Sequence, residues 1–312
     1  MMEFLTVVKQ VGMLGAIMLF GFLIVKTGYV EAKHKDSISK LIVKLILPCL
    51  IISSISKENF DISKLGDLMT VAGMSVFCIL TFFLIGVGTA KLLKIPQATE
   101  AAHKMMFCLG NVIFMGYPII IAMYGEMGFF YAIIYWLLND LFMWTVGVFL
   151  LSKNNGEKGE PFWKKLVNPN TISFAIAIVM FVLGIKLPPV LNEAMTSVGG
   201  LTTALSMIFI GMTLATVDVK KTMKKWWVFA IIPIKLVLMP LAFIYLFKSL
   251  GIKEILIGVV VLEAAMPSQT VLTILAHEHN SDYEYTAVGL FATTVISLVT
   301  LPLVCWFLQN LV

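Results

Sequence analysis

Two short stretches of the chain interrupt apolar runs that are each long enough to cross a bilayer. They read Asn111-Val112-Ile113-Phe114-Met115-Gly116-Tyr117-Pro118 and Glu263-Ala264-Ala265-Met266-Pro267-Ser268-Gln269. Proline lacks a backbone donor and clashes with the carbonyl four residues earlier, so we expect each helix to break there. Irregular backbone at membrane depth is tolerated only when it is buried in protein or lines a watery cavity. Two interrupted segments in matching places of two halves indicate a secondary transporter's binding site. A pair of simple proline kinks is the alternative.

The composition indicates an all-α integral membrane protein. Of the 312 residues, 59% are hydrophobic and 13% are charged, whereas a soluble domain averages about 45–50% and about 25%. The net charge of +5 includes 23 lysines and no arginine. Most of these lysines fall in predicted loops, so membrane topology explains them better than a nucleic-acid partner does.

The apolar runs predict ten spanning helices of about 20 residues each. They cover residues 5–30, 38–56, 67–93, 101–124, 127–151, 169–187, 191–216, 226–249, 253–277 and 283–309. The breaks fall in the fourth helix of each five, which favours two repeats, 1–152 and 169–312, joined by a polar loop at 153–168. An odd number of helices per repeat makes the second repeat inverted, so the broken fourth and ninth helices run antiparallel and cross near the midplane.

The lysines predict the orientation. Fourteen of them lie around the loops that follow the first, third, fifth and seventh helices, and five lie on the opposite side. Cytoplasmic loops carry the excess of basic residues. We therefore expect a multi-pass protein of the cell membrane with the 153–168 loop in the cytoplasm and both termini outside.

The breaks predict an anion site. Each half-helix that begins after a break offers unpaired backbone donors and the positive end of its dipole, an arrangement that binds carboxylates and phosphates. Pro118 and Pro267 suit the first position of these half-helices. The candidate substrate-binding residues are Asn111, Gly116, Pro118, Pro267, Ser268, Gln269 and Lys235. Local capping of the broken backbone is an alternative role for the polar side chains.

Three charged residues fall well inside the predicted helices, where charge is costly and usually functional, whereas Lys9, Lys26 and Lys44 lie nearer helix ends. We expect Asp140 and Glu263 to bind a coupling ion, Na⁺ or H⁺, and Lys235 to attract the anion. A structural ion pair of Lys235 with either acid is the alternative. No nucleophile–base pair, phosphate loop or zinc-ligand spacing appears, so we expect no catalytic residue, metal site or other cofactor, and hence no enzyme.

Several stretches resemble the auxin efflux carrier family. They are Gly28-Tyr29-Val30, Ser39-Lys40-Leu41, Leu47-Pro48, the run from Gly110 to Pro118, Met266-Pro267, Ile274-Leu275-Ala276, Asp282, and the run from Ser297 to Pro302. The resemblance implies ten helices in an inverted repeat with crossed broken helices. The family's crossover asparagine and prolines correspond to Asn111, Pro118 and Pro267. Glu263 with Gln269 is similar to the sodium site of the bile acid–sodium symporters, a related fold.

The resemblance also implies two domains with different roles. The first, second, sixth and seventh helices would form a scaffold, often dimeric, and the other six a mobile transport domain that works as an elevator. The short central loop is similar to that of bacterial members, which are thought to move small carboxylates such as malate or malonate, whereas plant members move auxin. We therefore expect a homodimeric organic-anion transporter. A cation-coupled exchanger of the sodium/proton type and a non-transporting membrane sensor are the alternatives.

Overall fold

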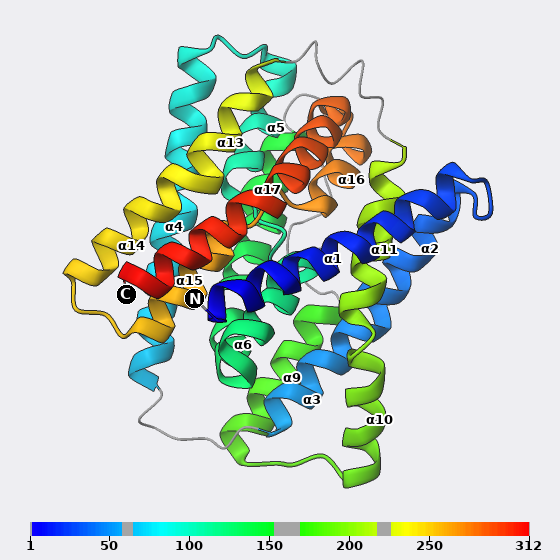
Figure 1. The fold of residues 1–312 in the computed structure, drawn as a ribbon, viewed down its shortest axis with the longest axis vertical. Helices are drawn as coiled ribbons and strands as arrows, with labels where there is room; N and C mark the ends of the chain where they lie inside the picture. Colours follow the sequence, from blue (N-terminus) through cyan, green and yellow to red (C-terminus); the bar gives the residue numbers. More distant parts are fainter. Residues whose placement is uncertain (1, 58–64, 153–168, 217–225, 312) are drawn as a thin grey trace. The chain divides into compact units, whose positions relative to one another are not determined.

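The computed structural model describes residues 2–57, 65–152, 169–216 and 226–311, and the regular elements in these ranges are helices. The first half contains α1 (Met2–Lys26), η1 (Ala32–His34), α2 (Lys35–Leu41), η2 (Ile42–Ile46), α3 (Leu47–Lys57), α4 (Leu65–Leu92), α5 (Gln97–Cys108), η4 (Val112–Gly116), α6 (Tyr117–Phe142), η5 (Met143–Gly147) and α7 (Val148–Ser152). The second contains α9 (Pro169–Leu183), α10 (Pro189–Gly199), α11 (Thr202–Leu214), η7 (Trp226–Ala230), α13 (Ile231–Pro233), η8 (Ile234–Leu238), α14 (Met239–Ser249), α15 (Glu254–Ala264), α16 (Thr270–Glu278) and α17 (Tyr283–Leu311) (Figure 1).

Six helical stretches in the described residues are long and apolar enough to cross a membrane. They are Ala32–Ser54, Leu65–Leu92, Val112–Ser152, Pro189–Leu214, Trp227–Ser249 and Tyr283–Leu311. The prediction of an all-helical membrane protein is confirmed. The count of ten crossings and the inverted repeat stay predictions, and the predicted 153–168 loop lies outside the described residues.

One stretch combines two predicted helices. Val112–Ser152 has 41 residues, far more than one crossing needs. Gly125 interrupts it with φ 60° and ψ −159°, a conformation that residues with a side chain rarely adopt. This interruption falls between the predicted fourth and fifth helices, at 101–124 and 127–151. The predicted turn is therefore present, although the helix is otherwise continuous on both sides of Gly125.

The chain forms two compact units, each built from both halves of the sequence. One unit contains Met1–Gly12, Thr70–Phe162 and Val217–Val312, and the other contains Met13–Met69 and Trp163–Thr216. The second unit thus holds most of the predicted first helix and the second, sixth and seventh helices, the set that the resemblance assigns to a scaffold. We call it the four-helix unit, and the other the crossover unit, because both broken helices belong to it.

Within the four-helix unit, α3 packs against α9 and α10. The backbones of α1 and α11 approach closely, because a Cβ on Gly211 would clash with the carbonyl oxygen of Met18. Small residues at such contacts are typical of helix packing in membranes. Within the crossover unit, α17 packs against α5, α14 and α16, and α15 packs against α6 and α14 (Figure 1). These contacts hold the halves of the broken helices among intact ones.

Candidate functional site

The two broken helices pair with each other through extended backbone. Helix α5 ends at Cys108, and Leu109 has the extended dihedrals φ −92° and ψ 121°. Gly110 then forms an isolated antiparallel bridge with Ser268, and the Asn111 backbone N–H donates to the Pro267 carbonyl over 2.7 Å. Both helices are therefore broken, and the two breaks meet directly. The first break lies at residues 109–111, at the start of the predicted stretch 111–118, which is helical from Val112 onward.

The prolines do not stand where the sequence predicted. Pro118 is the second residue of α6, and the first break precedes it at residues 109–111, separated from it by the π-helix η4. Pro267 lies three residues before α16 begins, so it is not the first residue of that helix. Its carbonyl accepts the Asn111 N–H beside the bridge, so Pro267 belongs to the segment that pairs with the first break. The predicted first-helical position is therefore wrong for both prolines.

Buried side chains complete the hydrogen bonding of the bridge. Asn111 Nδ2 donates to Thr270 Oγ1 over 3.3 Å. The Gly110 backbone N–H donates to Asn139 Oδ1 over 3.2 Å, and the Ser268 backbone N–H donates to Thr293 Oγ1 over 3.2 Å. The Asn111 side chain thus bonds the Thr270 side chain and makes no cap hydrogen bond to the backbone of η4, so the capping alternative is not found for Asn111.

Lys235 lies at the end of α5. Its side chain is 1% exposed, and Nζ donates to the carbonyls of Met106 (3.1 Å), Phe107 (2.8 Å) and Leu109 (2.7 Å). Ser268 Oγ also donates to the Met106 carbonyl over 3.0 Å. These are the carbonyls that a helix leaves without partners where it ends.

The predicted alternative for Lys235, an ion pair with a buried acid, is not found among the described residues. The ammonium contacts backbone carbonyls, not Asp140 or Glu263. An ammonium has three donors, and the three carbonyls use all of them. Lys235 can therefore offer an anion its charge but no free hydrogen bond.

Glu263 brings a carboxylate from the second broken helix against the first. The side chain is 2% exposed, and a Cβ on Gly116 would lie 2.5 Å from its Oε2. Only glycine leaves room for the carboxylate at this place. Among the described residues, Oε2 has no hydrogen-bond partner. A buried carboxylate oxygen without a partner is costly, so this oxygen is suited to a proton or a cation.

Asp140 is connected to the crossover through Gln269. Asp140 Oδ2 accepts from Trp136 Nε1 over 2.9 Å, and Oδ1 accepts from Gln269 Nε2 over 3.4 Å. Gln269 Oε1 is buried and has no partner among the described residues. The amide thus uses its donor on one acid and leaves its acceptor available, which suits a cation ligand better than an anion ligand.

The structure thus gathers the predicted residues Asn111, Gly116, Ser268, Gln269, Asp140, Glu263 and Lys235 at or next to the crossing. It adds three that sequence reasoning missed: Asn139, Thr270 and Thr293. Asn139 could have been found, because an amide beside Asp140 in an apolar run is unusual. Thr293 belongs to a polar face of the tenth predicted helix that is equally typical of helix packing.

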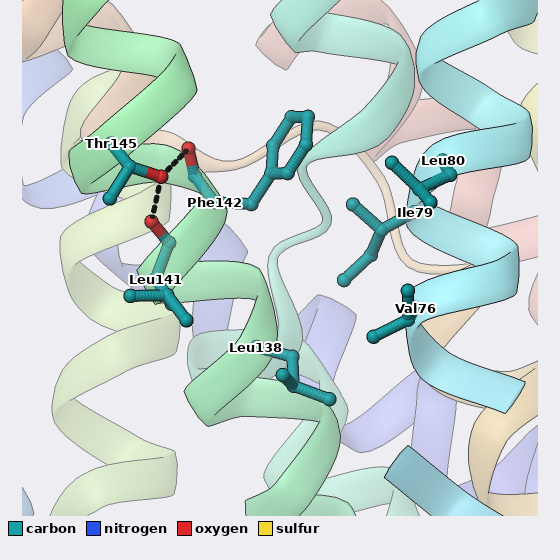
Figure 2. A pocket seen from close by; sticks show the side chains of 7 residues that line it. All are labelled: Val76, Ile79, Leu80, Leu138, Leu141, Phe142 and Thr145. Atoms are coloured by element: carbon teal, nitrogen blue, oxygen red, sulfur yellow. Dashed lines mark hydrogen bonds between the residues drawn. The ribbon is translucent and has the colours of Figure 1, made fainter. Parts of the chain in front are cut away.

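An apolar cavity of about 170 Å³ lies elsewhere in the crossover unit, between α4 and the junction of α6 with η5 (Figure 2). It is lined by Val76, Ile79, Leu80, Leu138, Leu141, Phe142 and Thr145. The Thr145 hydroxyl, its one polar side-chain group, points back to the carbonyls of Leu141 and Phe142. This lining suits hydrocarbon, so the crossover remains the candidate for an ionic substrate.

Comparison with known proteins extends over nearly the whole chain. The membrane transport protein family matches residues 6–305. A transporter of Methanothermobacter thermautotrophicus, described as uncharacterized, is 24% identical over 291 residues, which are 92% of this chain and 93% of that protein. A second, from Methanocaldococcus jannaschii, is 23% identical over 94% of this chain and 96% of its own. The uncharacterized transporter YfdV of Escherichia coli is 23% identical over 92% of this chain and 93% of its own.

Proposed function

Because the chain belongs to the membrane transport protein family, which includes the auxin efflux carriers, we propose that it moves a small organic anion across the cell membrane. The substrate is a mono- or dicarboxylate such as malate or malonate, or an auxin-like acid. Movement is of the elevator type, with the crossover unit carrying the substrate and the four-helix unit serving as the scaffold of a homodimer. The observation that carries the proposal is the direct pairing of two broken helices at residues 109–111 and 265–269.

The ends of the half-helices support an anionic substrate. Helix η4 and helix α16 both begin within two residues of the bridge, at Val112 and Thr270. The positive ends of their dipoles therefore converge at the crossing. Asn111 and Ser268 add neutral polar groups there, while the chain has no arginine that could bind a carboxylate instead.

The buried charges support coupling to a cation. Lys235 contributes one positive charge near the crossing, and Glu263 and Asp140 contribute two negative charges when ionised. An added carboxylate would leave an excess of negative charge in a low-dielectric site, which is strongly unfavourable. A cation that enters with the anion, Na⁺ or H⁺, removes this excess. Glu263 Oε2 and Gln269 Oε1, both without partners among the described residues, are its proposed ligands.

We further propose ten crossings in two inverted repeats, with both termini outside. The lysine imbalance between the two sets of loops supports this orientation. Lys158 falls on the side proposed to be cytoplasmic. A Lys158→Cys variant should react with an impermeant thiol reagent only in inside-out vesicles. Reaction in intact cells would overturn the orientation. The wild-type protein, treated in the same way, controls for labelling of the native Cys49.

A binding screen tests the substrate class. Purified wild-type protein is heated with malate, malonate, indole-3-acetate and an uncharged amide of each, with and without NaCl at constant ionic strength. We expect at least one carboxylate, but not its amide, to raise the melting temperature, because a ligand that binds only the folded state stabilises it. Stabilisation by the amides as well would remove the argument from the helix dipoles.

The unpartnered acceptors favour a second candidate, a cation exchanger in which Glu263 and Asp140 bind the transported ion itself. The two candidates differ in a single measurement. Proteoliposomes loaded with buffer should take up ²²Na⁺ without any organic acid if the protein is an exchanger. They should require the acid, or show no sodium uptake at all, if the anion is the substrate.

A further inference from the structure

The carbonyl end of α5 forms a complete cation site that the chain fills with its own side chain. We propose that Lys235 is a tethered cation: its ammonium occupies a cage of backbone carbonyls that would otherwise bind a free monovalent cation. Only the consequence for ion coupling, given below, rests on the proposed transport function. The occupancy of the cage can be tested without any substrate.

The ligands around Nζ are those of a cation-binding site. Three carbonyl oxygens, of Met106, Phe107 and Leu109, lie 2.7–3.1 Å from Nζ, in the range of charge-assisted hydrogen bonds. The centre of the Phe82 ring lies 5.6 Å away, within reach of a cation–π interaction. Converging backbone carbonyls replace the hydration shell of monovalent cations in selective channels.

The cage lies where related transporter architectures bind a driving ion. In transporters with broken helices, unwound carbonyls and the ends of half-helices coordinate the driving Na⁺. Leu109 supplies such an unwound carbonyl, and Met106 and Phe107 supply the last turn of a half-helix. The negative end of the α5 dipole adds to their attraction for positive charge. In this chain the place for a driving ion at the first break is already taken.

The local structure around Lys235 directs it into the cage. Lys235 belongs to the π-helix η8, which follows Pro233 and precedes Pro240. The wider π-turn changes the direction of side chains relative to a regular helix, and such turns are frequent at functional sites. The ammonium thereby reaches α5 although α14, which continues η8, packs mainly against α15 and α17.

The occupied cage limits where a coupling ion can bind. A free cation at the first break would compete with a covalently attached one, whose effective concentration is far higher. Any driving Na⁺ or H⁺ must therefore use the acceptors contributed by the second broken helix, Glu263 and Gln269. Lys235 acts on the transport site as a positioning residue: it holds the end of α5 in place and, when protonated, supplies a positive charge.

Cation rescue of a truncated lysine tests the inference. Full-length Lys235→Ala is purified beside the wild type and Lys248→Ala. The Lys248 side chain is an exposed lysine whose Nζ donates to the Leu311 carbonyl, which makes it a matched control. Melting temperatures are measured in ammonium, methylammonium, sodium and N-methylglucamine chlorides at equal ionic strength, in the absence of any organic acid.

We expect only Lys235→Ala to be stabilised in a saturable way by a small cation. At saturation the shift should reach about 3 °C or more over N-methylglucamine, which is too large for the cage. The wild type and Lys248→Ala should show no such difference. A Lys235→Ala protein that is monodisperse but indifferent to the small cations, or a wild type that responds equally, would overturn the proposal.

A second variant keeps the inference testable if Lys235→Ala does not fold. Lys235→Gln is shorter than lysine and keeps two of the three donors for the carbonyls, but it removes the charge. If Lys235 merely satisfies hydrogen bonds, Lys235→Gln should bind carboxylates like the wild type. If its charge matters, carboxylate affinity should fall at least about tenfold while the melting temperature stays near that of the wild type. Loss of all transport by the wild type would refute the proposed function and leave the cation rescue unaffected.

Discussion

The two broken helices pair at their breaks but are completed by different chemistry. At the end of α15 the chain caps itself, since the Ala265 N–H donates to the carbonyls of Val261 and Leu262, and the Met266 N–H donates to that of Glu263. At the end of α5 the carbonyls depend on side chains from elsewhere, Lys235 and Ser268. The same backbone crossing is thus self-sufficient in one half and assembled from distant residues in the other.

The two breaks also differ in which hydrogen-bonding groups they leave unused. Within the described ranges, the half that caps itself leaves Glu263 Oε2 and Gln269 Oε1 without hydrogen-bond partners, whereas the α5 carbonyls of the other half accept from Lys235. The proposals above therefore place a free cation beside the second break and not beside the first. If this reading is correct, changes at the two breaks should have unequal effects on coupling.

The largest effect is expected at Gly116 in η4, where the helix after the first break contacts Glu263 at the end of α15. A valine there would place its Cβ 2.5 Å from Glu263 Oε2, so the carboxylate must move. We expect Gly116→Val to reduce carboxylate flux at least about tenfold, because small displacements of bound groups are costly, and to lower stability by about 1–3 kcal/mol from overpacking. Flux in proteoliposomes and the melting temperature are the measurements.

Gly88→Val in α4 is the matched control for this variant, because a Cβ on Gly88 meets nothing within 4 Å. It should leave flux unchanged. Equal losses in both variants would mean that valine disturbs the unit generally, and the contact between the two breaks would lose its special role.

The next effect compares the acid of each half. Glu263→Gln should remove the dependence of transport on Na⁺ or pH, because it removes the charge beside the unpartnered acceptors. Asp140→Asn should change it less, because Trp136 and Gln269 already donate to both oxygens of Asp140. Both proteins should fold, since a neutral isostere is easier to bury than a charge. Flux across a series of Na⁺ concentrations and pH values gives the comparison.

The decisive result is which of these two variants loses more of its ion dependence. Ion dependence that survives in both would return the acids to a structural role. Ion dependence lost only in Asp140→Asn would place the coupling ion in the first half and contradict the occupied cage at Lys235.

The smallest effect is expected at Ser268. Its hydroxyl donates to the Met106 carbonyl, which also accepts from Lys235. Ser268→Ala should therefore cost only about 1 kcal/mol, a decrease of about 2–4 °C in the melting temperature. A decrease several times larger would show that Ser268, rather than Lys235, is the main cap of α5.

Much of this arrangement follows from sequence, because the local rules for breaking a helix are strong. The interrupted stretches, the meeting of the two breaks and the place of Asn111 could be predicted from where Pro118 and Pro267 stand in apolar runs. The same rules misplaced the prolines themselves. Proline permits a helix start but does not require one, and at Pro267 the bridge to Asn111 decides the backbone instead.

The partners of the buried polar groups could not be predicted. Lys235 was expected to face an anion or an acid, but the π-turn in η8 sends it to the end of α5. Which face of a helix meets which neighbour depends on packing that a single apolar sequence does not reveal. Asn139 was missed for the same reason. Its side chain accepts from the Gly110 N–H, a contact that only the packing of the helices reveals.

The most direct test of the account is uptake of radiolabelled malonate or malate, whichever binds, by proteoliposomes containing the wild type, Asn111→Ala or Asn310→Ala. Asn310 is an exposed asparagine near the end of α17 and serves as the matched control. The account predicts saturable uptake by the wild type and Asn310→Ala, and a loss of at least about tenfold in Asn111→Ala, whose amide lies at the crossing. Wild-type uptake by Asn111→Ala, or a wild-type protein that carries cations and no carboxylate, would contradict it.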